Sequence, residues 1–140
     1  MDLTRRKTFF LVLLLSRVSA WASERASLLS KTYRFEDLPV EKEKQVAYRA
    51  ILEGRTHTGD YLEAHETVLE PNGIPHPAHR HVGEELFLIS TGTLEVTISG
   101  KRTRLGPGSA FFVASNEEHQ IQNVGSTPAQ YFGITLGQAA

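Results

Sequence analysis

The 140-residue chain contains no cysteine. This excludes disulfides, thiolate metal sites such as zinc fingers and iron–sulfur clusters, and a cysteine nucleophile. It also lacks a strong charge of either sign, because 15 Lys and Arg oppose 16 Asp and Glu for a formal net charge of −1. That balance disfavours a general nucleic-acid binder. Helical periodicity and internal repeats are missing too, so the composition is that of one ordinary globular domain.

The N-terminus has the three parts of a secretory signal peptide in the right order. Positive residues at 5–7 precede an unbroken apolar run of seven at Phe9–Leu15, and Ala20-Trp21-Ala22 places small residues where a signal peptidase reads them. The apolar run is much shorter than the roughly 20 residues of a membrane-spanning helix. We expect a signal peptide over 1–22, cleavage before Ser23 and an exported protein, periplasmic or secreted. Thr4-Arg5-Arg6 leaves the twin-arginine and general secretory routes both open.

The rest of the chain reads as a flexible leader over 23–31 and one β-domain over 32–140. Leu94, Val96 and Ile98 alternate with polar residues, which is the pattern of a strand with one buried face. Short apolar runs separated by glycine and proline turns predict an all-β sandwich or barrel. The expected strands are 46–52, 61–69, 85–90, 94–98, 110–113, 119–124 and 131–136.

Three potential metal ligands are separated by two and four residues: His79, His81 and Glu85. On one extended strand, residues of equal parity face the same side. We therefore expect the two imidazoles and the carboxylate to converge, with Phe87 and Ile89 continuing that face as an apolar wall. Imidazole and carboxylate ligands together suit iron, manganese, nickel, copper or zinc.

A fourth ligand is expected to be His119. It opens a strand in which His119, Ile121 and Asn123 share one face while Gln120 and Gln122 share the other. The glutamines indicate the outer side, so His119 faces the interior, where an unpaired imidazole is costly. A structural histidine, hydrogen-bonded within the barrel, is the alternative interpretation.

The spacing of these residues resembles the first of two motifs of the cupin family. The pattern Gly73-x5-His79-x-His81-x3-Glu85-x6-Gly92 agrees at every fixed position.

The second cupin motif has glycine, proline, glycine, histidine and asparagine at fixed spacing. This chain has Gly108, Ala114, Asn116, His119 and Asn123 at those positions. Asn116 in place of glycine is a mild departure, because asparagine tolerates the left-handed conformation of a turn. Ala114 in place of proline touches no ligand.

The resemblance, to small single-domain bacterial cupins, implies a double-stranded β-helix that holds one divalent transition metal on His79, His81, Glu85 and His119. Fe(II) or Mn(II) are expected first, with zinc, nickel and copper as alternatives. Positions left open on the metal are typical of catalytic sites. The resemblance favours a dioxygenase-type oxidoreductase acting on a small oxygen-rich compound, with isomerase, lyase and decarboxylase chemistry as alternatives. It also implies a homodimer.

Two further interpretations stay open at the level of sequence. One is an exported small-molecule-binding module without catalysis, and the other is a storage protein. No residue stands out as a catalytic base, although Glu84, Glu117 and His76 are candidates. Neither nucleic acid nor stable insertion in a membrane after cleavage is expected.

Overall fold

The computed structural model describes residues 27–138. The predicted signal peptide over 1–22, and the leader as far as residue 26, lie outside the described residues. From Ser27 the chain pairs with the end of a long strand, since the Leu28 N–H donates to the Arg55 carbonyl at 2.7 Å. No helix within 27–138 is long and apolar enough to cross a membrane.

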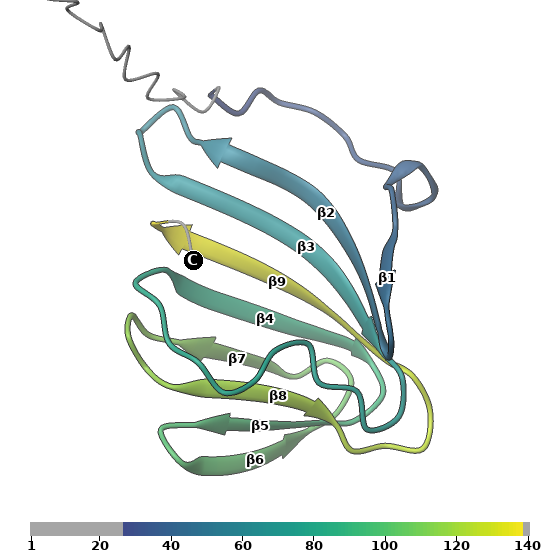
Figure 1. Ribbon diagram of the computed structural model, residues 1–140. Coiled ribbons are helices and arrows are strands. Elements are labelled where there is room, and N and C mark those ends of the chain that lie inside the picture. The colour runs from purple at the N-terminus through teal and green to yellow at the C-terminus, as the bar shows by residue number, and fades with distance from the viewer. Residues whose placement is uncertain (1–26, 139–140) are drawn as a thin grey trace, which may run out of the picture.

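The described part consists almost entirely of antiparallel strands, as Figure 1 shows. A short 3-10 helix, η1 (Phe35–Asp37), precedes them. The strands are β1 (Glu41–Glu43), β2 (Val46–Arg55), β3 (Tyr61–Leu69), β4 (Glu84–Thr91), β5 (Leu94–Ile98), β6 (Lys101–Leu105), β7 (Ala110–Val113), β8 (His119–Asn123) and β9 (Ala129–Gly137).

These strands form two sheets, one with the order β1-β2-β3-β9-β4-β7 and one with the order β6-β5-β8. Apolar side chains from both sheets meet in a single core. Its buried members are Leu69, Phe87, Ile89, Leu94, Val96, Val113, Ile121, Ala129 and Tyr131. The expected double-stranded β-helix is confirmed, because strands of both antiparallel sheets turn alternate residues toward this shared interior.

All seven predicted strands are present, with ends that differ by up to three residues. The expected faces are confirmed as well: Phe87, Ile89 and Ile121 are buried, and Gln120 and Gln122 are less so. Asn116 has the expected left-handed backbone, with φ of 62°.

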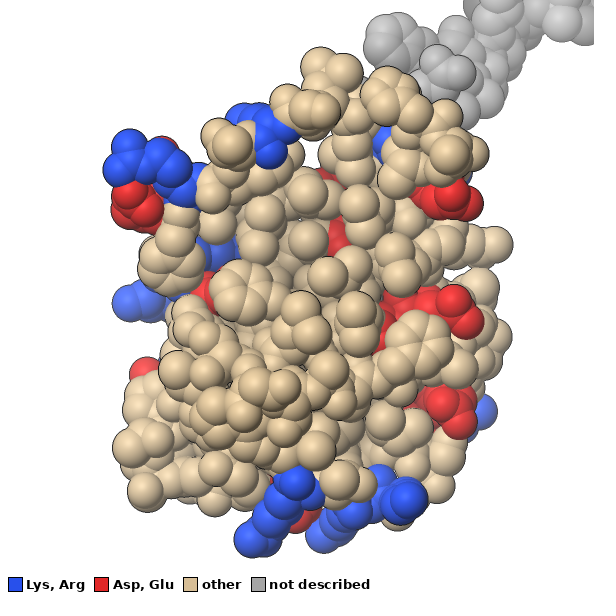
Figure 2. All heavy atoms as spheres, turned by 180° about the vertical axis from the view of Figure 1, so that it is seen from behind, with Lys and Arg blue, Asp and Glu red and all other residues tan. Residues whose placement is uncertain are grey.

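Two strands, β1 and β6, were not predicted, because neither carries an apolar pattern. Each lies at the edge of its sheet, and four of the five residues of β6 are exposed. Figure 2 shows Lys and Arg gathered at the bottom of the molecule, the end at which Figure 1 places β5 and β6. Charged side chains on an edge strand oppose pairing with another chain. Because most of β6 is exposed, its hydrogen bonds to the neighbouring strand stabilise it, and burial does not.

Asn123 ties β8 to two neighbouring segments. Its side-chain amide donates to the carbonyls of Leu69 at 2.8 Å and Thr127 at 2.9 Å, and its oxygen accepts from the Gly125 N–H at 2.9 Å. Asn123 is fully buried. The structural role expected for this residue follows directly from these three bonds.

Replacing Asn123 with alanine leaves two carbonyls and one N–H without their partner. We expect N123A to lower the free energy of unfolding by about 2–4 kcal/mol, because unsatisfied buried groups lose their hydration without compensation. Urea unfolding followed by circular dichroism measures this. Gln122→Ala, on the opposite face of the same strand, is the control and should change stability by about 0.5 kcal/mol or less. Equal effects of the two variants would contradict the role of Asn123.

Candidate metal centre

The connection between β3 and β4 places two of the predicted ligands by running alongside β8. Its backbone pairs with β8 near Asn123, where the Asn123 N–H donates to the Gly73 carbonyl at 3.0 Å. Further along, His79 and His119 exchange two backbone hydrogen bonds of 3.2 and 2.9 Å. His79 and His81 therefore belong to an irregular segment, and the prediction that they share one strand with Glu85 is wrong. They reach the site because this segment is held against β8.

The three histidines are oriented by bonds from Nδ1 to backbone carbonyls. His79 Nδ1 lies 2.9 Å from the Pro77 oxygen, and His119 Nδ1 lies 3.0 Å from the Glu117 oxygen. His81 Nδ1 lies 3.0 Å from the oxygen of Gly83. A carbonyl can only accept, so the neutral form of each ring carries its hydrogen on Nδ1 and has a lone pair on Nε2. Second-sphere bonds of this kind commonly fix metal-ligating imidazoles.

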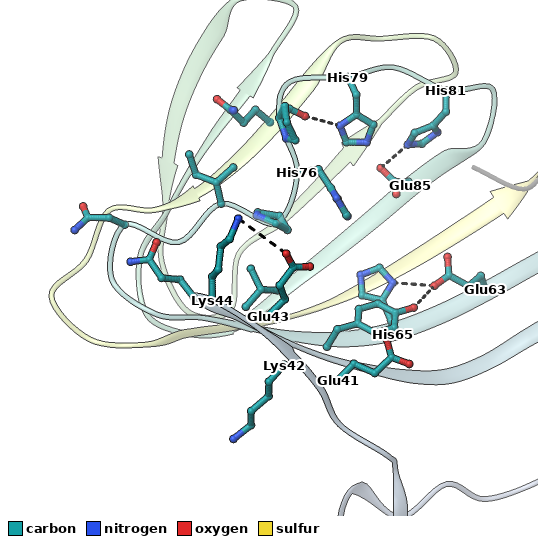
Figure 3. Close-up of a pocket in the computed structure, with 18 residues that line it drawn as sticks. Glu41, Lys42, Glu43, Lys44, Glu63, His65, His76, His79, His81 and Glu85 are labelled. Carbon is teal, nitrogen blue, oxygen red and sulfur yellow. Dashed lines mark hydrogen bonds and ion pairs between the residues drawn. The ribbon is translucent and has the colours of Figure 1, made fainter.

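In Figure 3, His79 and His81 lie near Glu85, the second residue of β4. One ring nitrogen from each of His79, His81 and His119 lies within 4.8 Å of the other two. Glu85 Oε2 lies 3.3 Å from His81 Nε2 and 3.1 Å from His119 Nε2. Yet His81 Nε2 and Glu85 Oε2 are buried without a properly directed hydrogen-bond partner among the described residues. Nitrogen and oxygen lone pairs thus face one another at a point that requires a positive charge.

The electrostatics of the side chains show the same demand. Contact with the Glu85 carboxylate raises the pKa of His119, although burial opposes this. Burial alone would raise the pKa of Glu85, but His119 and the charge on His81 outweigh it and lower the pKa. In the metal-free protein a proton on His119 would therefore supply part of the missing positive charge.

A divalent transition metal fits this donor set. Three imidazole nitrogens and one carboxylate oxygen are the donors that such ions prefer, and a metal would satisfy the two buried atoms that lack partners. The four residues predicted from sequence are thus brought together.

Three of the four predicted ligands, His79, His81 and Glu85, line one wall of a pocket of about 1190 Å³, whose other lining residues include several titratable side chains. His76 lines it from the exposed connection before β4. Tyr48, Glu63 and His65 line it from β2 and β3. Sequence reasoning missed these three. For Glu63 and His65 the available signal was parity, because they share the inward face of β3 with Tyr61, Thr67 and Leu69.

Comparison with known proteins adds a family to this geometry. The cupin domain matches residues 65–135, just over half of the chain. The chain belongs to the cupin family. The match includes all four predicted ligands.

A curated relative of this cupin is dimethylsulfoniopropionate lyase DddQ of Ruegeria pomeroyi. The two are 37% identical over 73 residues, which is 51% of this chain and 36% of the relative, so the match spans about a third of that protein. Among solved structures, KdgF from Halomonas sp. is similar with a TM-score of 0.69 and 14% identity, over 79% of this chain and 96% of that one. An RmlC-like cupin from Shewanella frigidimarina has a TM-score of 0.67 and 16% identity, over 82% and 95%. At these identities the solved structures show the fold alone.

The ligand set can be tested by metal analysis of the purified protein. We expect about one transition-metal ion per chain, since the four donors converge on one point. The double variant His79→Ala/His81→Ala should lose it, because only two donors remain. Mass spectrometry of the metal content measures both, and circular dichroism checks that the variant is folded.

His57→Ala is the matched control, because His57 is exposed on the turn between β2 and β3 and should leave the metal content unchanged. Full metal retention in the folded double variant would refute the site.

Proposed function

We propose that this cupin is a metal-dependent enzyme acting on a small oxygen-rich compound in the pocket beside His79, His81, Glu85 and His119. One observation carries the proposal: two buried atoms without a hydrogen-bond partner, His81 Nε2 and Glu85 Oε2, belong to residues that line a pocket large enough for a ligand. A bound metal ion would supply Lewis acidity, which polarises a carbonyl or carboxylate oxygen. Fe(II) or Mn(II) remain the ions proposed first.

For the reaction, lyase chemistry has the better support. The curated relative is named a lyase, and Tyr48, Glu63, His65 and His76 offer proton-transfer groups within the same pocket. Lyase and isomerase reactions at a carbon beside a carboxylate or carbonyl need such groups, because a proton leaves or joins that carbon. The relative's length exceeds the match, so its substrate is a starting point for assays only.

The dioxygenase-type oxidoreductase predicted from sequence is the second candidate. A set of histidines and one carboxylate with open positions is also a ligand set for non-haem iron, so the same donors would serve oxygen chemistry. A binding module without catalysis is the third candidate. The three candidates differ in what each consumes: a lyase consumes only its substrate, an oxidoreductase consumes oxygen as well, and a binding module consumes neither.

These candidates can be separated with the protein purified from the exported fraction, whose intact mass also shows whether it begins at Ser23. The protein is loaded with Fe(II) or Mn(II) and incubated with small carboxylates, including dimethylsulfoniopropionate and β-hydroxy acids. We expect cleavage products by NMR without uptake of dissolved oxygen, and their loss in His79→Ala/His81→Ala. Oxygen uptake coupled to substrate loss would establish the oxidoreductase instead. Binding of a compound by calorimetry without turnover or metal dependence would leave the binding module.

We also propose the homodimer expected from the family resemblance, formed through the outer face of the larger sheet. The register places Leu86 beside Ile134 and Phe112, and Leu88 beside Phe132, which gives a continuous apolar surface. On it Leu88 is 43% and Phe112 is 49% exposed. A two-fold axis through one such surface would bury it against its copy.

A negative charge at the centre of this face should break the dimer. We expect Leu88→Asp/Phe112→Asp to sediment as a monomer at concentrations at which the unmodified protein sediments as a dimer, because each charge would be buried without a partner. Leu29→Asp, at an apolar side chain that is 76% exposed near the end of β2, which two strands separate from β4, is the control. A monomeric unmodified protein would refute the dimer.

A further inference from the structure

A second polar cluster faces the pocket from β2, β3 and β9, apart from the metal ligands. Its centre is Glu63, whose carboxylate accepts three side-chain hydrogen bonds. The Tyr48 hydroxyl donates to Oε1 at 3.1 Å, His65 Nδ1 lies 3.0 Å from the same oxygen, and Thr135 Oγ1 donates to Oε2 at 3.0 Å. In Figure 3, Glu63 and His65 lie together across the pocket from His79, His81 and Glu85.

Glu63 is held in its ionised form by these bonds. Burial acts to raise its pKa, but the hydrogen bond and charge of His65 and the bonds from Thr135 and Tyr48 outweigh burial and lower the pKa. Tyr48 stays a donor, because burial and the neighbouring Glu63 raise the pKa of its hydroxyl. An ionised carboxylate can only accept hydrogen bonds.

The tautomer of His65 follows from this. Because Glu63 Oε1 is an acceptor, the neutral form of His65 carries its hydrogen on Nδ1 and has a lone pair on Nε2. Within residues 27–138 that Nε2 makes no hydrogen bond, and it is not among the buried side-chain atoms without a partner. A purely structural histidine of a barrel interior would use both of its nitrogens. His65 uses one, and the residue lines the pocket.

The neighbouring strand makes room for this ring. Gly133 lies opposite His65 in the register of β3 and β9. A Cβ on Gly133 would lie 2.4 Å from His65 Cε1 and 2.5 Å from Nε2, closer than side-chain atoms approach one another. The imidazole therefore lies directly on bare backbone, with Tyr48 tilted against its other side at 5.1 Å between ring centroids. Packing fixes its orientation, as a proton-transfer group requires.

We propose that His65, oriented by Glu63, is the group that takes a proton from the compound bound at the metal ligands. This inference rests on the proposed lyase function. The C–H bond beside the ligand's carboxylate breaks, its electron pair stays on carbon, and an N–H bond forms at His65 Nε2. In an elimination that pair forms the C=C bond as the β-substituent departs with its own bonding pair. The imidazolium is stabilised by the Glu63 carboxylate and passes its proton to water, so no oxidant is needed.

The tautomer can be measured without any substrate. In the protein loaded with Zn²⁺, a diamagnetic ion, long-range ¹H–¹⁵N spectra distinguish the two nitrogens of each imidazole, and His65→Gln identifies the signals. We expect His65 to be the Nδ1–H tautomer in the unmodified protein and a mixture in Glu63→Gln. Diethylpyrocarbonate, which acylates unprotonated imidazole nitrogens, should label His65 several-fold more slowly in Glu63→Gln, and His57 at an unchanged rate. An Nε2–H tautomer, or an Nε2 that is not labelled, would overturn the proposal.

Turnover then tests the role of the dyad. With a compound that the unmodified protein cleaves, His65→Gln should lower kcat by about 100-fold or more while KM and metal content change little, because a general base contributes about 10²–10⁴-fold. Glu63→Gln should lower kcat less, since it acts through His65, and His57→Gln should leave it unchanged. An unaltered kcat in His65→Gln would overturn the dyad and leave the lyase standing. If nothing is cleaved, the lyase fails, and the spectra and labelling still decide the state of His65.

Discussion

The site of this protein depends on one backbone interaction, the pairing of the β3–β4 connection with β8. The connection has no regular secondary structure, yet its peptide groups bond to β8 at both ends of that strand, at Asn123 and at His119. Just before β8 in the chain, the Asn116 N–H donates to the His81 carbonyl at 2.7 Å. Without these bonds, His79 and His81 would lie on a free loop, and the cost of ordering that loop would fall on metal binding itself. In the folded protein the connection is already ordered, so metal binding does not have to order it.

This arrangement gives the site an electrostatic requirement for a positive charge. In their neutral forms, the three imidazoles donate their hydrogens to carbonyls and have lone pairs on Nε2, and the Glu85 carboxylate adds further lone pairs. Two of these atoms, His81 Nε2 and Glu85 Oε2, are buried without a hydrogen-bond partner, which is unfavourable unless a cation or a proton lies between them. The metal would therefore bind to a site already arranged for it, and the second-sphere carbonyls are as much a part of that site as the ligands.

The pocket has two unlike walls. One carries the proposed metal ligands His79, His81 and Glu85, and the other carries Tyr48, Glu63 and His65, which are joined by hydrogen bonds. This division separates the two tasks of an elimination or isomerisation, namely polarising an oxygen and moving a proton. The cupin fold alone does not indicate which reaction is catalysed, because proteins with one fold can have different activities. The proposal about the reaction therefore rests on the residues of the second wall.

The sequence by itself determined the strands with strong alternation, the interior face of β8 and the identity of all four proposed ligands. Those features depend on the spacing of residues along the chain, and this spacing can be read from the sequence alone. Only the tertiary structure decided that His79 and His81 lie off the strand, because their position depends on bonds to a segment about 40 residues away. The edge strand β6 was equally hidden, since its partner stabilises it and its own polar residues do not. Glu63 and His65 lay within a predicted strand, 61–69, whose inward face was not predicted. Their meaning appeared only when Tyr48, Thr135 and the bare backbone at Gly133 were brought beside them from other strands.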